Sequence, residues 1–409
     1  MGDDMQISRR QFLGYGLGGA AGSLVGGLGF PSASLAADTI KAGVLLDLSG
    51  PLQLYGHVKA QCLELAAEEI NAKGGLLGKK IELVKYDTQS NNQLYGQYAQ
   101  QLALKDRVAV VHGAITSAAR EVARPVLARA KTLYIMNMIN EGPEGACDRN
   151  MFTTGPTPQQ LLNNLIPYMI KKHGKKVYIL AADYIFGQLS AKWAERIAKE
   201  NGGEVVGLDL FPMDVDKFGS TIGKIQAAKP DFVFNVFVGP AHAAFYGQWA
   251  SAGMNKRIPM ASHTIGDSGE QLRMPPDVSE GIVTVKNYFD ELDTPASKAF
   301  IERFKKRFDD YTYVGSLGVA DYQGMLLWAE AVRKAGSVDR RKVIEAFESG
   351  IAIDGPSGRL ASHPATHYCT MDMYLAEIQN SRFKVQESWK QVPPVSAGDD
   401  SCDVLKMPL

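Results

Sequence analysis

The stretch IKAGVLL at residues 40–46, followed by a helical pattern at 59–73 and by KIELVKY at 80–86, forms one strand–helix–strand unit. The first stretch is a short apolar run, which is typical of a strand buried on both faces. The middle stretch, KAQCLELAAEEINAK, places apolar residues at helical spacing and stops at two glycines, a common helix end. Such a unit predicts two neighbouring parallel strands.

The same alternation continues along the chain and restarts once, at Thr157. Further strands are predicted at 108–111, 133–136, 177–180, 204–210 and 231–237, and further helices at 91–105, 117–130, 158–172, 188–201, 218–228 and 241–252. Repeated strand–helix–strand units imply a parallel sheet with helices on both faces. Two sets of them predict an α/β protein with two doubly wound parallel-sheet lobes.

The last third of the chain does not build a third set of this kind. It holds a strand-like stretch at 281–289, three amphipathic helices at 297–309, 320–335 and 340–349, and a hairpin pattern at 368–378 and 383–389. This order of elements is explained if the helices pack on the first lobe and the strands join the sheet of the second lobe.

The N-terminal residues 1–36 have the pattern of an export signal. Arg9 and Arg10 precede an uncharged apolar stretch at 12–30, and small residues follow at 32–37. This order is typical of a secretory signal, and the paired arginines indicate the twin-arginine type. The alternative is a membrane anchor, but the many glycines in this stretch make a poor spanning helix. We therefore expect a periplasmic protein.

Composition and motifs exclude several functions. The chain carries 44 basic and 44 acidic residues, so it lacks the cationic excess of a nucleic-acid binder or an anionic-membrane binder. No nucleophile elbow, phosphate loop, zinc motif or Cys-x-x-Cys pair occurs in the sequence. We expect no enzyme, no metal and no cofactor.

Polar and aromatic residues follow the predicted strands, where ligands bind in open α/β sheets. Residues 113–117 (GAITS) open a helix, whose free N–H groups suit a carboxylate or carbonyl oxygen. The simpler reading is that Ser117 only caps this helix. The other strand ends supply Tyr55, Asn137, Met138, Tyr184, Phe186, Phe237 and Val238.

The order of several short motifs resembles one family over residues 39–390. The motifs are Ser49-Gly50-Pro51-Leu52 with Tyr55-Gly56, LAAEEINAKGG at 65–75, residues 113–120, Glu141-Gly142, Asp183-Tyr184, AAKPD at 227–231, Asp293-Thr294-Pro295 and GPSG at 355–358. Together they resemble the type I periplasmic solute-binding proteins of ABC importers. The similar branches bind leucine, isoleucine and valine, or urea and short-chain amides.

The resemblance implies two lobes that close on a ligand and are joined by three crossings at a hinge. Lobe one would comprise 38–156 and 289–365, lobe two 157–288 and 366–398, and a C-terminal tail 399–409. The implied partners are a small-molecule ligand and a membrane permease that recognises the closed form. We expect a monomer without nucleic-acid partners. A periplasmic sensor that feeds a signalling partner is the alternative function.

The resemblance also implies site residues, position by position. Ser117 matches a serine that holds a carboxylate or amide oxygen, and Phe186 stands where relatives carry a ligand-contacting tyrosine. Residues 264–267 lie near the place of an acidic partner for an ammonium group. The expected ligand-binding set is Tyr55, Ile115, Thr116, Ser117, Asn137, Met138, Tyr184, Phe186, Phe237, Val238, Thr264 and Asp267.

Two further expectations follow for an exported protein of this kind. Thiols can pair in an oxidising compartment, and we expect Cys147 to bridge to Cys402 in the tail, with Cys62 and Cys369 as buried free thiols. The expected ligand is a branched-chain or related amino acid, then a short amide or urea, then an aromatic or other small acid.

Overall fold

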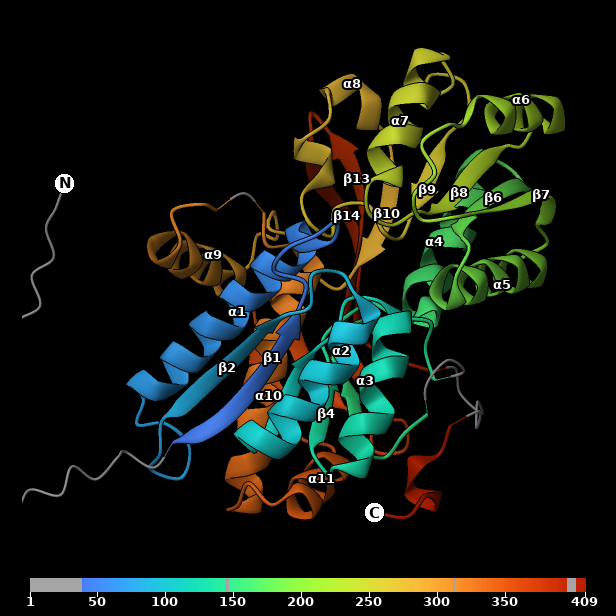
Figure 1. Cartoon of the computed structure of the whole chain (residues 1–409). Helices are drawn as coiled ribbons and strands as arrows, with labels where there is room; N and C mark the ends of the chain where they lie inside the picture. The colour runs from blue at the N-terminus through green and yellow to red at the C-terminus, as the bar shows by residue number, and fades with distance from the viewer. Residues whose placement is uncertain (1–38, 144–146, 312, 396–401) are drawn as a thin grey trace, which may run out of the picture. The chain divides into compact units, whose positions relative to one another are not determined.

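The first part of the chain builds a five-stranded parallel sheet. The computed structural model describes residues 39–143, 147–311, 313–395 and 402–409. The expected signal at 1–36 and residues 399–401 of the expected tail therefore lie outside the described residues. The strands are β1 (Ile40–Leu46), β2 (Ile81–Asp87), β3 (Val110–Gly113), β4 (Leu133–Met136) and β5 (Met151–Thr153), in the order β2-β1-β3-β4-β5 (Figure 1).

Three helices connect these strands. They are α1 (Gln53–Ala72), α2 (Asn92–Gln100), which continues as a π-helical turn at Gln101–Asp106, and α3 (Ser117–Arg129). The last two start at side-chain caps: Asn91 accepts from the Gln93 N–H and Thr116 from the Ala119 N–H. Helix α1 begins six residues earlier than the apolar spacing predicted, which adds the buried Tyr55 and Val58 to its inner face.

The second sheet has nine strands. They are β6 (Lys176–Ala182), β7 (Glu204–Phe211), β8 (Phe232–Val236), β9 (Met260–Ser262), β10 (Val283–Lys286), β11 (Ala352–Gly355), β12 (Gly358–Ser362), β13 (Cys369–Gln379) and β14 (Arg382–Val392). Strands β6 to β10 are parallel, whereas β13 pairs antiparallel with both β10 and β14. The hairpin at the end of the chain therefore extends this sheet, as its sequence pattern predicted.

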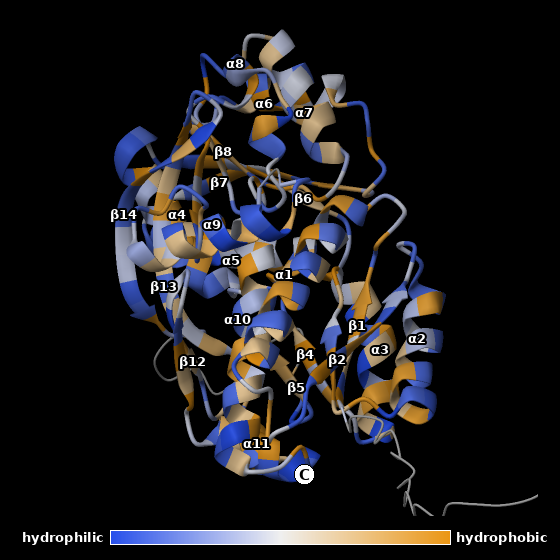
Figure 2. Ribbon diagram, turned by 90° about the vertical axis from the view of Figure 1, so that its left-hand side faces the viewer, coloured by the Kyte–Doolittle hydropathy of each residue, from blue (hydrophilic) through white to orange (hydrophobic). Residues whose placement is uncertain are grey.

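The helices beside this sheet carry hydrophobic and hydrophilic residues in alternation, which is visible as mixed colour in Figure 2. They are α4 (Pro158–His173), α5 (Ile185–Glu200), α6 (Gly219–Ala228), α7 (Ala241–Ser251) and the short α8 (Pro276–Ser279). The later helices α9 (Pro295–Arg307), α10 (Gly315–Ala335) and α11 (Arg340–Glu348) return to the first sheet, because α9 and α10 pack on α1 and α11 packs on α10.

Both sheets use the same strand order. The parallel part of the second sheet runs β7-β6-β8-β9-β10, which repeats the first order β2-β1-β3-β4-β5 shifted along the chain. In this order the connection after β1 runs to one side of the sheet, and the connection after β3 runs to the other side. A crevice therefore opens between the carboxyl ends of these two strands, and β6 and β8 form the same arrangement in the second sheet. The molecule therefore has one such switch point after β1 and β3 and another after β6 and β8.

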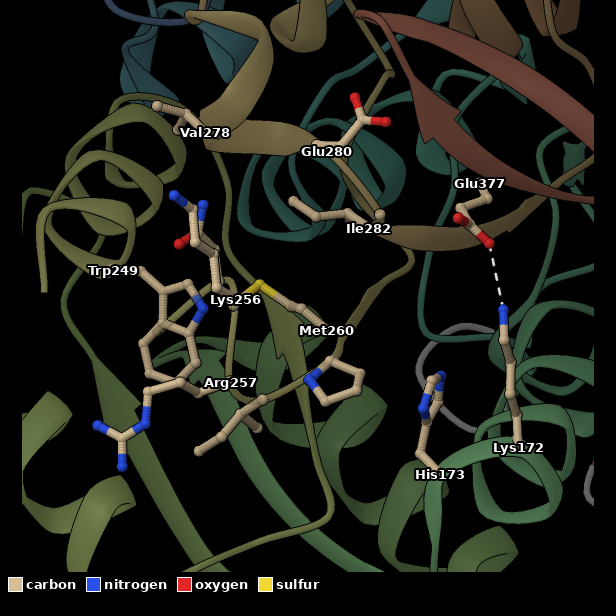
Figure 3. A pocket seen from close by; sticks show the side chains of 14 residues that line it. Lys172, His173, Trp249, Lys256, Arg257, Met260, Val278, Glu280, Ile282 and Glu377 are labelled. Carbon is tan, nitrogen blue, oxygen red and sulfur yellow. Dashed lines mark hydrogen bonds and ion pairs between the residues drawn. The ribbon is translucent and has the colours of Figure 1, made fainter. Parts of the chain in front are cut away.

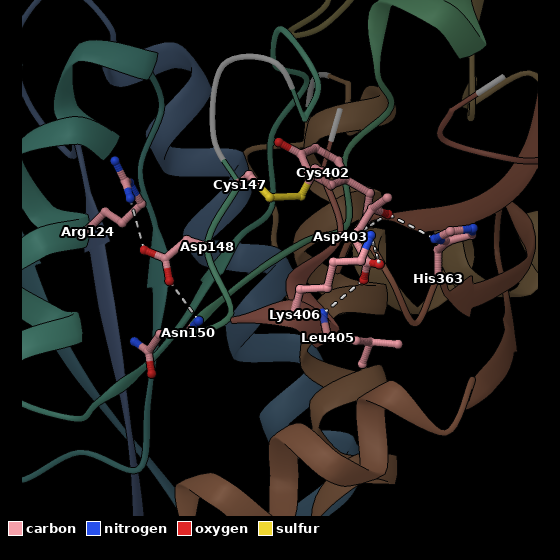
Figure 4. The surroundings of a disulfide bond; sticks show 11 residues. Arg124, Cys147, Asp148, Asn150, His363, Cys402, Asp403, Leu405 and Lys406 are labelled. Atoms are coloured by element: carbon pink, nitrogen blue, oxygen red, sulfur yellow. Dashed lines mark hydrogen bonds and ion pairs between the residues drawn. A yellow bond between two sulfur atoms is a disulfide. The ribbon is translucent and has the colours of Figure 1, made fainter. Parts of the chain in front are cut away.

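A disulfide joins Cys147, in the loop before β5, to Cys402 near the C-terminus (Figure 4). This is the pair expected from the sequence, and Cys62 and Cys369 are both buried free thiols. Beside the bridge, Arg124 on α3 pairs with Asp148 at 3.0 Å between Nη1 and Oδ2. The bridge thus attaches the end of the chain to the first sheet. Among the described helices, none has the length and apolar character needed to cross a bilayer.

Candidate functional site

One small cavity lies at the two switch points. Its lining comes from α1, from the segments after β3 and β4 of the first sheet, and from those after β6, β8 and β9 of the second. The lining residues are Tyr55, Ile115, Thr116, Ser117, Met138, Ile139, Tyr184, Phe186, Phe237, Val238, Thr264 and Asp267. Eleven of the twelve residues expected from the sequence are thus brought together around one space.

The twelfth expected residue, Asn137, lies behind the cavity. Its Nδ2 donates to Asp321 Oδ1 at 2.9 Å, and its Oδ1 accepts from the Thr154 hydroxyl at 2.8 Å. Its backbone carbonyl accepts from the buried ammonium of Lys59, which also pairs with Asp321. Gly324 leaves the necessary room, because a Cβ there would stand 2.2 Å from Asn137 Oδ1. The next residues, Met138 and Ile139, line the cavity, and Ile139 was not predicted from the sequence.

The first wall of the cavity, which we define as Ile115, Thr116, Ser117, Met138 and Ile139, contains the N-terminus of α3. Thr116 Oγ1 accepts from the Ala119 N–H at 3.1 Å, and the Arg120 N–H bonds the Thr116 carbonyl. Within the described residues, the N–H groups of Ser117 and Ala118 find no hydrogen-bond acceptor. They and the positive end of the helix dipole suit an oxygen of a ligand.

A buried ion pair stands behind this wall. The Ser117 hydroxyl donates to Glu141 Oε2 at 2.6 Å, and Glu141 Oε1 accepts from Arg120 Nη2. The Arg120 and Glu141 side chains are both fully buried. Burial lowers the pKa of Arg120, but the adjacent Glu141 carboxylate outweighs it and raises that pKa, so the guanidinium stays charged. The Arg120–Glu141 pair was not predicted from the sequence.

The second wall, which we define as Tyr184, Phe186, Phe237 and Val238, is mainly aromatic. The rings of Tyr184 and Phe186 have centroids 5.9 Å apart. Phe237 joins a cluster in which its ring centroid lies 5.2 Å from that of Phe218 and 5.1 Å from that of Phe245. Rings packed at these distances hold one another in place, so this wall offers a fixed apolar surface.

Thr264 and Asp267 complete the lining from the loop after β9. Asp267 Oδ1 accepts from the Lys286 ammonium and, at 2.8 Å, from the Ser316 hydroxyl of α10. Burial raises the pKa of Asp267 to about 6, although Lys286 acts in the opposite direction. Thr264 Oγ1 lies 3.0 Å from Nε2 of His242, and burial lowers the pKa of that histidine to about 4. These polar groups are thus already engaged by the protein.

Tyr55 connects α1 to the second wall. Its hydroxyl accepts from the Gly239 N–H at 3.2 Å, which joins α1 to the loop after β8. Burial raises the pKa of Tyr55, so its hydroxyl stays protonated and keeps a hydrogen to donate. Tyr55 also lines a second hollow, together with Leu54 and Met274.

A larger hollow of about 780 Å³ lies elsewhere, beside the amino ends of β9 and β10 (Figure 3). Met260 and Ile282 line it together with the Lys172–Glu377 ion pair, whose atoms are 3.2 Å apart. Ligands of open α/β sheets bind at the carboxyl ends of the strands, so the smaller cavity is the candidate site. No set of three or more metal-ligating side chains occurs in the described parts of the chain.

A cavity lined from both switch points is typical of a solute-binding protein, and the comparisons with known proteins agree. The model of the periplasmic binding protein family matches residues 39–382, and the chain belongs to this family. A Leu/Ile/Val-binding protein homolog 7 from Brucella abortus is 27% identical over 351 residues, which cover 80% of this chain and 85% of the relative.

Two solved structures show the same fold. A solute-binding protein of an ABC transporter from Rhodopseudomonas palustris, in complex with 3,4-dihydroxybenzoic acid, has a TM-score of 0.78 and 25% identity, and the match covers 87% of this chain and 99% of that one. The substrate-binding protein LivJ from Streptococcus pneumoniae, in complex with isoleucine, has a TM-score of 0.75 and 21% identity, with coverages of 87% and 100%.

The family fixes the general role of the chain. It is a solute-binding protein of the ABC transporter class, not an enzyme, and its relatives bind small molecules and deliver them to ABC permeases. The family also implies a location in the periplasm.

Proposed function

We propose that this chain captures a small solute with a polar head and an apolar body for an ABC uptake system. The proposal rests on one observation: one wall of the cavity carries polar groups and the other is mainly aromatic. The N-terminus of α3 offers the N–H group of Ser117, while Phe186 and Phe237 offer aromatic surface from the second sheet. The head of the solute would lie against α3, and its body would lie against the rings.

The ligand class we favour is a branched-chain or related amino acid, followed by a short amide or urea and then an aromatic or other small acid. The curated relatives named for leucine, isoleucine and valine support the first class. The 25%-identical neighbour solved with a dihydroxybenzoic acid supports an aromatic acid. The aromatic wall suits all of these better than a sugar, whose hydroxyl groups would lack partners there.

Capture would proceed by closure of two lobes at a hinge. The proposed lobes are residues 38–156 with 289–365 and residues 157–288 with 366–398. A ligand that contacts both walls binds the closed form more tightly and so shifts the population toward it. The Tyr55–Gly239 hydrogen bond between α1 and the second wall supports a closed arrangement. We propose a monomer, since one chain supplies both walls.

A binding screen tests this function. Purified chain lacking residues 1–36 would be heated with leucine, isoleucine, valine, acetamide, urea or benzoate, one at a time. A ligand at 100 times its dissociation constant stabilises the folded state by about 2.7 kcal/mol and raises the melting temperature. We expect one chemical class to give a clear shift that calorimetry then confirms. No shift with any member would contradict the proposed ligand classes.

Export by the twin-arginine route is a separate proposal, based on Arg9 and Arg10. Replacing both by lysine should leave the precursor in the cytoplasm, where it is detected by fractionation and by its uncleaved mass. Normal periplasmic export of that double variant would contradict this route while leaving the binding function untouched.

A further inference from the structure

The hydroxyl of Ser117 is held by a carboxylate that the ligand cannot reach directly. Ser117 lines the cavity, whereas Glu141 lies behind it with a fully buried side chain. The distance from Ser117 Oγ to Glu141 Oε2 is 2.6 Å. This is the range of a charge-assisted O–H···O⁻ hydrogen bond.

The direction of this hydrogen bond follows from the charge of Glu141. Its other oxygen accepts from Arg120 Nη2, and Arg120 also donates from Nε to Glu121 at 2.8 Å. A carboxylate paired with a guanidinium has no hydrogen to donate. The Ser117 hydroxyl must therefore point its hydrogen at Glu141, which leaves only oxygen lone pairs toward the cavity.

The polar end of the cavity thus presents a mixed pattern. The N–H groups at the start of α3 donate, and Ser117 Oγ accepts. A simple carboxylate accepts from the N–H donors, but its oxygen lone pairs repel those of Ser117 Oγ. An α-amino acid places an ammonium N–H beside its carboxylate, and a primary amide places an N–H beside its carbonyl, so both match the pattern.

We infer that Glu141 is a positioning residue that makes the site select heads carrying an N–H donor beside an oxygen, over simple carboxylates. The inference rests on the proposed function, since it assumes that the ligand head lies against α3. Glu141 acts through Ser117 and does not itself touch the ligand. Arg120 fixes Glu141 in turn, and the bond from the Gly142 N–H to Asn140 Oδ1, 2.8 Å long, fixes the loop that carries it.

The variant Glu141→Gln tests the direction of the hydrogen bond. Its amide oxygen can still accept from Arg120, while its NH₂ group can donate to Ser117 Oγ. The Ser117 hydroxyl would then be free to donate into the cavity. Calorimetry would compare two matched pairs of probes, leucine with 4-methylpentanoate and benzamide with benzoate, on the wild-type chain and on the variant.

Of the probe pair that binds, we expect the wild-type chain to bind leucine or benzamide at least about tenfold more tightly than the matching carboxylate. This ratio corresponds to the free energy of about one hydrogen bond. Glu141→Gln should reduce this ratio about tenfold or reverse it. Ser117→Ala should also collapse the ratio, and it leaves the ion pair intact if the glutamine variant fails to fold. The double variant should match Ser117→Ala alone, because Glu141 acts only through the hydroxyl.

Two outcomes would overturn the inference. One is a wild-type chain that binds the simple carboxylate as tightly as its N–H-bearing partner. The other is a Ser117→Ala variant that weakens both members of a pair equally and so leaves the ratio unchanged. In both cases a ligand is bound, so the proposed function stands. If none of the four probes binds the wild-type chain, the proposed ligand class fails together with this inference.

Discussion

The two walls of the cavity are built from the same strand order but from different chemistry. The first wall presents the N–H groups and the serine hydroxyl of α3, backed by the Arg120–Glu141 ion pair. The second wall presents the rings of Tyr184, Phe186 and Phe237. A further acidic residue of the lining, Asp267, is occupied by Lys286 and Ser316.

The difference separates two tasks. On the first wall the buried ion pair orients the Ser117 hydroxyl, which faces the ligand. Charge there therefore determines which ligand heads can bind. Near the second wall the buried ion pair bonds to α10 through Ser316, so charge there holds the structure together. Changes to the second ion pair should therefore affect stability first, and changes to Ser117 should affect binding first.

The largest expected effect is the loss of stability in Asp267→Ala. The substitution leaves the Lys286 ammonium buried without its carboxylate, which should lower the free energy of unfolding by about 3–5 kcal/mol. Urea denaturation at neutral pH, where Asp267 is ionised, would measure it. A matched control is Glu195→Ala on α5, which breaks an exposed pair with Lys199 and should cost about 0.5 kcal/mol or less. Equal, small effects in both variants would show that Asp267 has no structural role.

The next effect concerns pH and His242, which lies behind Thr264. Burial lowers the pKa of His242 in the folded state from 6.5 to about 4. The unfolded chain therefore takes up a proton first as the pH falls, so the stability due to the neutral imidazole is complete above pH 6.5 and is lost toward pH 4. Between pH 7 and pH 5 this loss amounts to about 2 kcal/mol.

The variant His242→Gln isolates this contribution. The variant should not lose this part of its unfolding free energy as the pH falls. The difference in unfolding free energy between wild type and variant should therefore change by about 2 kcal/mol between pH 7 and pH 5. Titrating groups that do not interact with His242, such as Asp267, are present in both proteins and cancel in the difference; Glu270, whose pKa is lowered by His242 against the effect of burial, is replaced by glutamine in both backgrounds. A difference that stays constant with pH would mean that the pKa of His242 is the same in the folded and the unfolded chain.

Sequence patterns located most elements of this fold. The strand predicted at 133–136 matches β4, and the helix predicted at 117–130 matches α3 within one residue. Strands β5 and β9, with three residues each, were not predicted, because so short a run carries no distinguishable period. The carboxyl ends of the predicted strands led to most of the cavity lining, since parallel strands bring these ends to one edge.

The ion pairs could not be predicted in the same way. Lys59 and Asp321 are separated by 262 residues, and their contact depends on how α10 packs on α1. Likewise, the sequence shows Asn137 and Met138 side by side after a strand, but only the packing decides that Asn137 turns to Asp321 and Met138 to the cavity. Periodicity reports which face of an element is buried, and it does not report which distant side chain meets that face.

The smallest expected effect, and the one that separates the walls most directly, is that of Ser117→Ala on binding. Removal of the hydroxyl deletes one acceptor for the ligand head, which should weaken leucine or benzamide, whichever binds, about tenfold. The Arg120–Glu141 pair remains, but Glu141 Oε2 loses its hydrogen-bond donor, so the melting temperature should fall modestly. Ser251→Ala on α7, an exposed serine that bonds only the Gly247 carbonyl, is the matched control and should bind like the wild type. If Ser117→Ala instead lowered the melting temperature without changing affinity, the hydroxyl would be part of the structural network, and the first wall would resemble the second.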